Sequence, residues 1–321
     1  MRRALELAKL ARGCTSPNPM VGAVIVKDGR IVGEGYHRQA GGPHAEVFAL
    51  QAAGEQARGA TLYVTLEPCC HYGRTPPCTQ AIIAAGIAEV HVAMVDPNPL
   101  VAGKGLHELE QAGIRTFVGE HEAEARELNE VFVTYMTKGR PFVIVKYAMS
   151  LDGKIATRRG ESRGLTGEDW QRELHLLRSQ VDAILVGVNT VIHDDPLLTA
   201  RVEGCSRQPL RVILDRYLRT PPEARLLADT TPGKTMIVTT RRADDKRAAA
   251  LTKRGAEVFA AGDEDIDIMF LLTTLAQREI TSVLVEGGGQ VIASFFAAGV
   301  VDKVIAVIAP LIVGGQTAVT P

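Results

Sequence analysis

Apolar residues follow two alternating periods along the first 140 residues of the chain. Apolar positions at helical spacing predict helices over residues 4–11, 45–53, 78–85, 106–112 and 122–137. Short apolar runs rich in β-branched residues predict strands over 21–26, 31–36, 61–66, 89–95 and 114–118. Ser16-Pro17-Asn18-Pro19 ends the first helix, and Asp28-Gly29 predicts a hairpin turn. Strands that alternate with helices in this way indicate a layered α/β domain.

A second alternating series begins after Gly139-Arg140-Pro141, which breaks the last helical pattern. It predicts strands over 142–148, 183–188, 210–215, 235–239, 257–260, 282–285 and 303–308, and helices over 170–180, 244–254, 266–278 and 292–298. The 321 residues also exceed the roughly 250 at which one core usually splits. We therefore predict two domains, over residues 1–139 and 140–321.

The last eight residues, Gly314 to Pro321, are turn-like and follow an apolar strand without a terminal cap. We expect the second domain to need further C-terminal strands beyond this point, because a sheet without them would expose an unpaired edge.

Charge and hydropathy narrow the class of partner. With 36 basic and 37 acidic residues the net charge is −1, which does not favour nucleic acid or an anionic membrane as the main partner. No apolar run reaches the 18 residues of a membrane span, and the N-terminus carries no apolar signal core. We expect a cytoplasmic protein that acts on a small molecule.

The strongest chemical motif pairs His44-Ala45-Glu46 with Cys69 and Cys78. Three of the five cysteines lie between positions 69 and 78, which in a reducing compartment suggests a metal or catalysis before disulfides. One imidazole and two thiolates form a three-ligand zinc site that leaves a position open for water. Glu46, two residues after the histidine, fits the general acid/base of a zinc deaminase, whose motif this spacing matches.

The choice between neighbouring cysteines rests on local geometry. Adjacent side chains diverge, and we select Cys69 over Cys70 because it follows Pro68 at the start of a predicted helical turn. A closed structural zinc site with Cys70 or His71 as a fourth ligand is the alternative. Such a site would have no use for Glu46, so the catalytic interpretation is preferred.

A glycine run marks the second domain. Gly287-Gly288-Gly289 follows the predicted strand 282–285 and Glu286, and precedes a predicted helix. Glycines let a phosphate approach the backbone, and the free N–H groups of a helix N-terminus attract anions. A plain tight turn is the alternative, since a glycine-rich turn alone is weak evidence.

Together these motifs resemble the bifunctional deaminase–reductase family of riboflavin biosynthesis. Simpler cytidine and tRNA adenosine deaminases have two residues between their cysteines, whereas eight separate Cys69 from Cys78 here. The resemblance covers nearly the whole chain and rests on residues 16–19, 21–24, 44–46, 67–69, 71–78, 96–99, 146–154, 187–191 and 194–201.

The resemblance implies both a fold and a pair of reactions. The fold would be α/β, with an N-terminal cytidine-deaminase-like three-layer domain and a C-terminal dihydrofolate-reductase-like domain. The first domain would hydrolytically deaminate 2,5-diamino-6-(5-phosphoribosylamino)pyrimidin-4-one with zinc. The second would use NADPH to reduce the ribose of 5-amino-6-(5-phosphoribosylamino)uracil to a ribityl chain. A homo-oligomer is also expected.

The resemblance assigns residues to these sites. In the deaminase domain zinc would be bound by His44, Cys69 and Cys78, and Glu46 would be catalytic. The substrate could be bound by Asn18, His71 and Arg74. For Arg74 a solvated surface position is an equally good interpretation. In the reductase domain Lys146 and Asp194 would lie near the reacting carbon. The cofactor would contact Ala148, Gly164, Thr190, Asp194, Gly288, Gly289, Gln290, Val291, Ile292, Ala293 and Ser294. The substrate would contact Ser162, Arg178, Leu198, Arg201 and Glu286.

Two other classes of protein share part of this pattern. A tRNA-editing deaminase shares the zinc chemistry, but it needs a basic binding face, and the near-neutral charge and the second domain argue against it. A non-catalytic zinc protein would not need Glu46. A metal assay combined with turnover of a phosphoribosylaminopyrimidine separates these classes.

Overall fold

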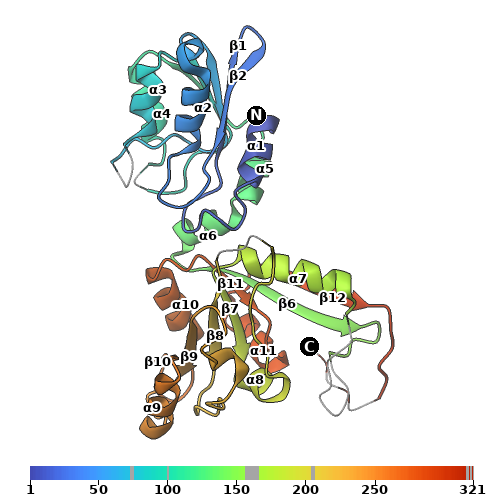
Figure 1. Cartoon of the computed structure of the whole chain (residues 1–321). Coiled ribbons are helices and arrows are strands. Elements are labelled where there is room, and N and C mark those ends of the chain that lie inside the picture. Colours follow the sequence, from blue (N-terminus) through green and yellow to red (C-terminus); the bar gives the residue numbers. More distant parts are fainter. Residues whose placement is uncertain are drawn as a thin grey trace. The chain divides into compact units, whose positions relative to one another are not determined.

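The computed structural model describes residues 1–72, 76–99, 101–155, 166–203, 207–315, 318 and 320. The chain forms two compact units, Met1–Gly139 and Arg140–Pro321, which are described separately (Figure 1). Each unit has its own sheet and its own buried apolar core.

The first unit is built on a five-stranded sheet in the order β2-β1-β3-β4-β5. Strands β1, β2 and β3 are antiparallel neighbours, whereas β3, β4 and β5 run parallel. The bounds are β1 Gly22–Lys27, β2 Arg30–Tyr36, β3 Thr61–Val64, β4 Glu89–Val92 and β5 Arg115–Val118. The predicted hairpin and all five predicted strands of this unit are confirmed.

Helices cover both faces of this sheet (Figure 1). They are α1 Arg2–Lys9, α2 Ala45–Ala53, the short 3-10 helix η1 Gly54–Ala57, α3 Cys78–Ala84, α4 Lys104–Gln111, α5 Glu122–Leu128 and α6 Glu130–Lys138. A Cβ at Gly22 would lie 1.9 Å from the Ala4 carbonyl oxygen of α1, and one at Gly35 would lie 2.4 Å from the Ala45 carbonyl oxygen of α2. Because Gly22 and Gly35 point to opposite faces of the β1–β2 ladder, α1 and α2 pack on opposite sides, as a three-layer domain requires.

The single helix predicted over residues 122–137 is wrong, because the structure divides it at Asn129. The Asn129 side chain accepts a hydrogen bond from the Met20 amide (2.8 Å) and donates one to the Met20 carbonyl (3.0 Å). Its backbone, at φ −107° and ψ 24°, lies outside the helical region. A contact 109 residues away in sequence therefore ends α5 and starts α6.

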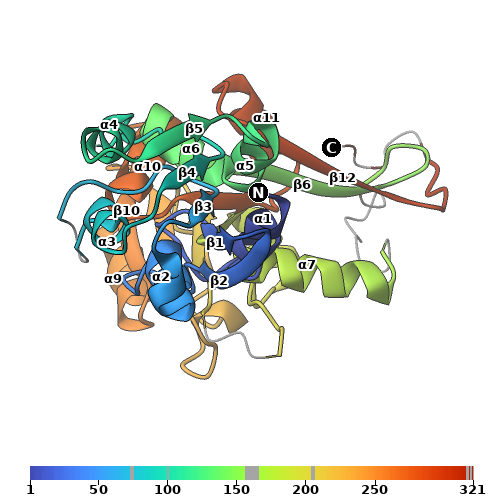
Figure 2. The same ribbon diagram turned by 90° about the horizontal axis from the view of Figure 1, so that it is seen from above.

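The second unit is built on a seven-stranded sheet in the order β10-β9-β8-β7-β11-β6-β12, with every neighbouring pair parallel. The bounds are β6 Phe142–Ser150, β7 Ala183–Gly187, β8 Leu210–Leu214, β9 Thr235–Thr239, β10 Glu257–Ala260, β11 Ser282–Val285 and β12 Lys303–Ala309. The long strands β6 and β12 run side by side at one edge (Figure 2). The continuous apolar sequences of β7 and β11 fit strands buried on both faces.

The helices of the second unit are α7 Glu168–Gln180, α8 Val188–Asp194, the 3-10 helix η2 Arg225–Leu227, α9 Asp245–Lys253, α10 Ile268–Gln277 and α11 Gly289–Ala297. Alternate β-strand residues such as Val145 and Val285 pack against Leu271, Leu275 and Phe295 of α10 and α11. Lys146, the next residue of β6, and Glu286, which directly follows β11, are therefore presented to the opposite face. Helix α8 was not predicted, because its seven residues are too few to show an apolar period.

An ion pair anchors the start of this sheet. Arg140 donates to both carboxylate oxygens of Asp302 at 2.6 and 2.9 Å, and the Val143 amide donates to the same carboxylate at 3.0 Å. The two side chains are 9% and 6% exposed. Replacing Asp302 with alanine leaves Arg140 buried and unpaired, so we expect a loss of about 3–5 kcal/mol of unfolding free energy. Urea unfolding of the full chain measures it.

The matched control is Glu264→Ala, which removes an ion pair with Arg242 whose side chains are 62% and 72% exposed. We expect a change of no more than about 1 kcal/mol there. If the two substitutions lowered the unfolding free energy equally, the burial of the Arg140–Asp302 pair would not add to its contribution to stability.

Candidate active sites

His44, Cys69 and Cys78 come together at one end of the first sheet. His44 is the N-cap of α2, Cys69 follows the loop after β3, and Cys78 begins α3. The Nδ1 atom of His44 lies 3.2 Å from Cys78 Sγ and 3.5 Å from Cys69 Sγ, and the possible ligand atoms all lie within 4.8 Å of one another. The Cys78 amide also donates to Cys69 Sγ at 3.4 Å. Hydrogen bonds from Cys78 and His44 lower the pKa of the Cys69 thiol to about 4.

Glu46 lies in the first turn of α2, beside this cluster, with a side chain in the interior. Its Oε2 atom is buried without a hydrogen-bond partner among the described residues. Burial raises the pKa of the Glu46 carboxyl, and the neighbouring His44 lowers it. Native structures rarely leave a buried carboxylate oxygen unpaired, and such an oxygen points to a group absent from the protein chain.

The donor set fits zinc. One imidazole nitrogen and two thiolate sulfurs within mutual reach are the soft ligands that zinc prefers, and three protein ligands are typical of a catalytic site. Cys70 and His71 do not join this cluster in the part of the chain that the structure describes. His71 Nδ1 is buried without a described partner. Arg74 lies outside the described residues.

Asn18 is oriented by a histidine that the sequence did not single out. His37 is buried, and its Nδ1–H donates to the Pro43 carbonyl at 3.0 Å. Its Nε2 therefore accepts from the Asn18 side-chain amide at 3.1 Å. The His37 ring lies edge-on to the His44 ring, with centroids 5.5 Å apart.

Glu67 is a second buried carboxylate near the cysteines, and its hydrogen-bond partners are backbone amides. It is 3% exposed, and its oxygens accept hydrogen bonds of 2.9–3.3 Å from the backbone amides of Asp96, Gly103, Gly105 and Leu106. The sequence motif Glu67-Pro68-Cys69 therefore includes a residue that fixes the loop after β4 and the start of α4 next to Pro68. A Cβ on Gly105 would lie 2.1 Å from the Pro68 carbonyl oxygen.

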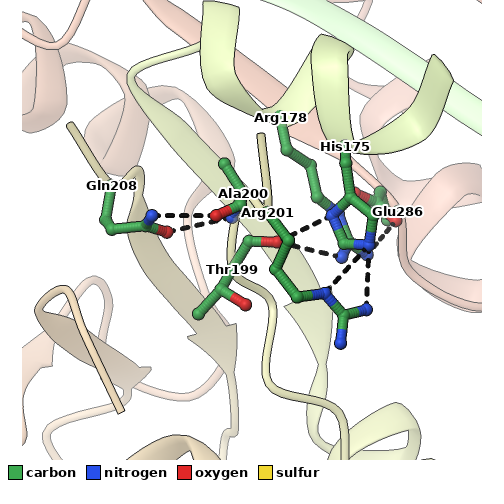
Figure 3. Close-up of polar contacts among 7 residues, drawn as sticks. All are labelled: His175, Arg178, Thr199, Ala200, Arg201, Gln208 and Glu286. Atoms are coloured by element: carbon green, nitrogen blue, oxygen red, sulfur yellow. Dashed lines mark hydrogen bonds and ion pairs between the residues drawn. The ribbon is translucent and has the colours of Figure 1, made fainter. Parts of the chain in front are cut away.

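In the second unit, α7 and the end of β11 present a paired arginine and glutamate. Arg178 donates to both oxygens of Glu286 at 2.7 and 2.8 Å, and the side chains are 11% and 7% exposed (Figure 3). Lys146 of β6 lies near this pair, with its Nζ 5.8 Å from the centre of the Trp170 ring. Burial lowers the pKa of Lys146, while the Glu286 carboxylate raises it and the Arg178 charge lowers it.

The segment Leu198 to Arg201 faces the same pair. Leu198 is 3% exposed and adopts a left-handed backbone with φ +51°. The Thr199 carbonyl accepts from Arg178 at 3.4 Å and from His175 at 3.2 Å (Figure 3). Arg178, Leu198, Arg201 and Glu286, which the resemblance assigned to the substrate, thus come from α7, β11 and one loop.

The proposed cofactor residues lie at the carboxyl ends of neighbouring strands. Thr190 and Asp194 belong to α8, which follows β7, and Gly289 begins α11, which follows β11. The two turns touch, because a Cβ on Gly187 would lie 2.8 Å from Val291 Cγ2. Gly288 caps α11 without a side-chain hydrogen bond and has open space at its Cβ. Ala148 lies in β6, and Ser162 and Gly164 lie outside the described residues.

The two units define a zinc-type deaminase domain joined to a nucleotide-dependent reductase domain. Residues 1–94 match the cytidine and deoxycytidylate deaminase zinc-binding region, and residues 141–321 match the RibD C-terminal domain. The chain belongs to the RibD family of riboflavin biosynthesis proteins, a family of bifunctional deaminase–reductases.

Relatives align over the whole chain. A riboflavin biosynthesis protein RibD from Aquifex aeolicus is 49% identical, with 98% of this chain and 87% of the relative covered. One from Synechocystis is 50% identical, covering 100% and 86%. The structure of Acinetobacter baumannii RibD, form 1, superposes with a TM-score of 0.90 at 43% identity, covering 99% of this chain and 88% of that one.

These comparisons confirm the predicted fold class, the resemblance and both enzyme activities. The predicted cofactors are confirmed as well: the deaminase domain binds zinc, and the RibD reductase domain uses NADPH. Among the described residues, no helix is both long and apolar enough to cross a membrane.

Proposed function

We propose that this chain catalyses two consecutive steps of riboflavin biosynthesis on a phosphorylated ribosylaminopyrimidine. A Thermotoga maritima protein that is 41% identical, with a TM-score of 0.87 over 99% of this chain and 88% of that one, is a diaminohydroxyphosphoribosylaminopyrimidine deaminase/5-amino-6-(5-phosphoribosylamino)uracil reductase. The single observation that carries the proposal is the cluster of His44, Cys69 and Cys78 beside the Glu46 carboxylate, whose buried Oε2 atom has no partner among the described residues.

In the deaminase domain, His44, Cys69 and Cys78 would hold zinc. Zinc at this position lowers the pKa of a water molecule to about 7, which supplies a nucleophile at neutral pH. Glu46 takes a proton from the attacking water and delivers it to the ring nitrogen. The same carboxylate then takes the remaining proton from the hydroxyl group now on the ring carbon and gives it to the amine, so that a carbonyl forms, the carbon–nitrogen bond breaks and ammonia leaves. Asn18, oriented by His37, offers a hydrogen bond to the substrate.

In the reductase domain, the glycine turn and the uncapped start of α11 fit a dinucleotide. Backbone amides of residues 288–290 would receive its phosphates, because no described side chain caps this helix N-terminus. NADPH, when bound, supplies a hydride to the first carbon of the ribose. Thr190 and Asp194 of α8 lie on the neighbouring turn and would contact the cofactor.

Lys146 supplies the proton that this reduction needs. When the hydride reaches the ribose carbon, the bond from that carbon to the ring oxygen breaks, and the ring oxygen must gain a proton. Burial lowers the pKa of the Lys146 ammonium, which makes that ammonium a stronger acid than an exposed lysine. Glu286 and Arg178 hold this side of the site in place, and Arg201 and Leu198 border it.

We predict that Lys146→Ala lowers NADPH oxidation with 5-amino-6-(5-phosphoribosylamino)uracil by about a hundredfold, the size typical of a lost general acid. Ammonia release from the diaminopyrimidine stays within about twofold, because Lys146 belongs to the other unit. Cofactor absorbance and an ammonia assay measure the two activities. Lys234→Ala, at an exposed lysine of the same unit, should change neither. Equal loss of both activities in a folded Lys146→Ala protein would contradict two independent sites.

Two general properties complete the proposal. The exposed edges of the two sheets favour a homo-oligomer, and light scattering of the full chain tests it. The free cysteines of the zinc cluster fit the reducing environment of the cytoplasm, which we propose as the location.

A further inference from the structure

Arg201 is held by a histidine, and among the described residues no carboxylate pairs with it. Its Nε and Nη2 atoms lie 3.0 and 2.8 Å from Nε2 of His175, which stands one turn before Arg178 on α7 (Figure 3). The other ring nitrogen, His175 Nδ1, lies 3.2 Å from the Thr199 carbonyl oxygen.

These contacts fix the protonation state of His175. A carbonyl oxygen can only accept, so Nδ1 carries the hydrogen in its contact with Thr199. A guanidinium can only donate, so Nε2 must offer its lone pair to Arg201. Both requirements are met only by the neutral imidazole protonated at Nδ1. A doubly protonated ring would place an N–H against the Arg201 donors.

The two arginines of this site therefore differ in free charge. The Arg178 charge is matched by Glu286 in a buried bidentate pair. A neutral imidazole leaves the Arg201 charge unmatched and still fixes the direction of the guanidinium. The backbone under Arg201 is held as well, because the Gln208 side chain donates to the Ala200 carbonyl and accepts from the Ala200 amide, both at 2.9 Å. A guanidinium that is held in one direction and has no carboxylate partner among the described residues suits the recognition of a phosphate.

The charges that face His175 oppose its protonation. Burial lowers the pKa of His175, and so do the nearby charges of Arg201 and Arg178. The hydrogen bond to Thr199 and the Glu286 carboxylate act in the opposite direction and are smaller. The neutral form is therefore the one present at neutral pH, and it is lost only as the pH falls below the ordinary range of histidine, about 6.5.

We propose that His175 is a positioning residue of the reductase site: as a neutral imidazole it aims Arg201 at the phosphate of the substrate, and protonation of the ring releases Arg201. This inference rests on the proposed function, because it takes the phosphorylated ribosylaminouracil as the ligand of Arg201. His175 itself does not touch the reacting atoms.

Three variants of the full chain test the proposal in NADPH oxidation, through the KM for the phosphorylated ribosylaminouracil. His175→Leu removes the nitrogen that accepts the hydrogen bonds of Arg201. We expect this KM to rise about tenfold at neutral pH, because one hydrogen bond to a charged group is lost, and kcat to stay within about threefold. His175→Gln keeps an acceptor that does not titrate, and its KM should stay within about twofold of the unchanged protein. In an Arg201→Ala background, His175→Leu should add no further rise in KM.

The pH profile separates positioning from a general structural role. As the pH falls from about 7.5 to about 5.5, the KM for this substrate should rise more in the unchanged protein than in His175→Gln, by a factor that grows below about pH 6.5 and stays under about tenfold. Protonation of the substrate phosphate affects both proteins equally, so it cancels in this comparison. Identical pH profiles, or a His175→Leu protein with unchanged KM at neutral pH, would overturn the role of His175. If His175→Leu does not fold, the His175→Gln profile decides alone.

A binding measurement distinguishes failure of this inference from failure of the proposed reaction. If the unchanged protein oxidises no NADPH with this substrate, the proposed reaction fails. Calorimetric binding of ribose 5-phosphate then tests His175 directly. Over the same pH range, we expect binding to weaken more in the unchanged protein than in His175→Gln, by less than about tenfold. Equal weakening in both, or no binding at neutral pH, overturns the inference.

Discussion

Glu46→Gln is expected to lose deamination by about a hundredfold to ten-thousandfold, the range for removal of a general acid/base. Glutamine has nearly the same size, but it cannot take a proton from water or pass one to the leaving amine. The metal content should stay at that of the unchanged protein, because Glu46 is not among the clustered ligand atoms. Elemental analysis for zinc and an ammonia assay on the diaminopyrimidine check the two parts.

The matched control is Glu55→Gln, the same substitution at an exposed position in η1, directly after the helix that carries Glu46. It should leave both zinc and ammonia release unchanged. The Glu46 variant should also oxidise NADPH at the normal rate when it is given the deaminated uracil. A zinc-loaded Glu46→Gln protein with near-normal ammonia release would remove Glu46 from the mechanism.

The sequence could predict those parts of the fold that depend on local pattern. Strands such as Thr235–Thr239 and Ser282–Val285 have the predicted bounds, because they are short apolar runs between turn residues. The helix Ala45–Ala53 is equally local: His44 caps it and Gly54 ends it. The cluster of His44, Cys69 and Cys78 was accessible for a related reason, since thiolates and imidazole at this spacing have few uses other than metal binding.

Contacts between distant residues could not be predicted in this way. Asn129 interrupts a continuous helical pattern because its side chain pairs with the Met20 backbone, and no local signal indicates a partner 109 residues away. The role of His175 depends on Thr199 and Arg201, which a loop brings beside α7 only after folding. In the sequence alone, a histidine within a helical pattern is indistinguishable from an ordinary helix residue.

Residues of the same type differ in role because their hydrogen-bond partners differ. The Glu67 carboxylate is saturated by four backbone amides and therefore organises a loop, whereas the Glu46 carboxylate keeps a buried oxygen without a described partner and is available for proton transfer. Arg178 is paired with Glu286, whereas Arg201 is held by His175 and, in our proposal, keeps its charge for the substrate phosphate. In both cases the hydrogen-bond partners, and not the residue type, distinguish a structural group from a functional one.

The second large effect concerns the metal. Cys69→Ala and Cys78→Ala should each lose tightly bound zinc and, with it, ammonia release, because two protein ligands hold zinc far more weakly than three. Cys70→Ser should retain both, since Cys70 lies outside the clustered ligand atoms of the described residues. Elemental analysis after dialysis against a chelator measures the retained metal.

The comparison of adjacent cysteines makes this test decisive, because Cys69 and Cys70 differ by one position and are both partly exposed. General damage to the loop would affect the two variants alike, whereas ligation affects only one. NADPH oxidation with the deaminated uracil should survive in all three variants, since the reductase site belongs to the other unit. A zinc-free Cys70→Ser protein, or a Cys69→Ala protein that keeps its metal, would mean that the neighbouring cysteine is the ligand and that the metal site is arranged differently from the cluster described above.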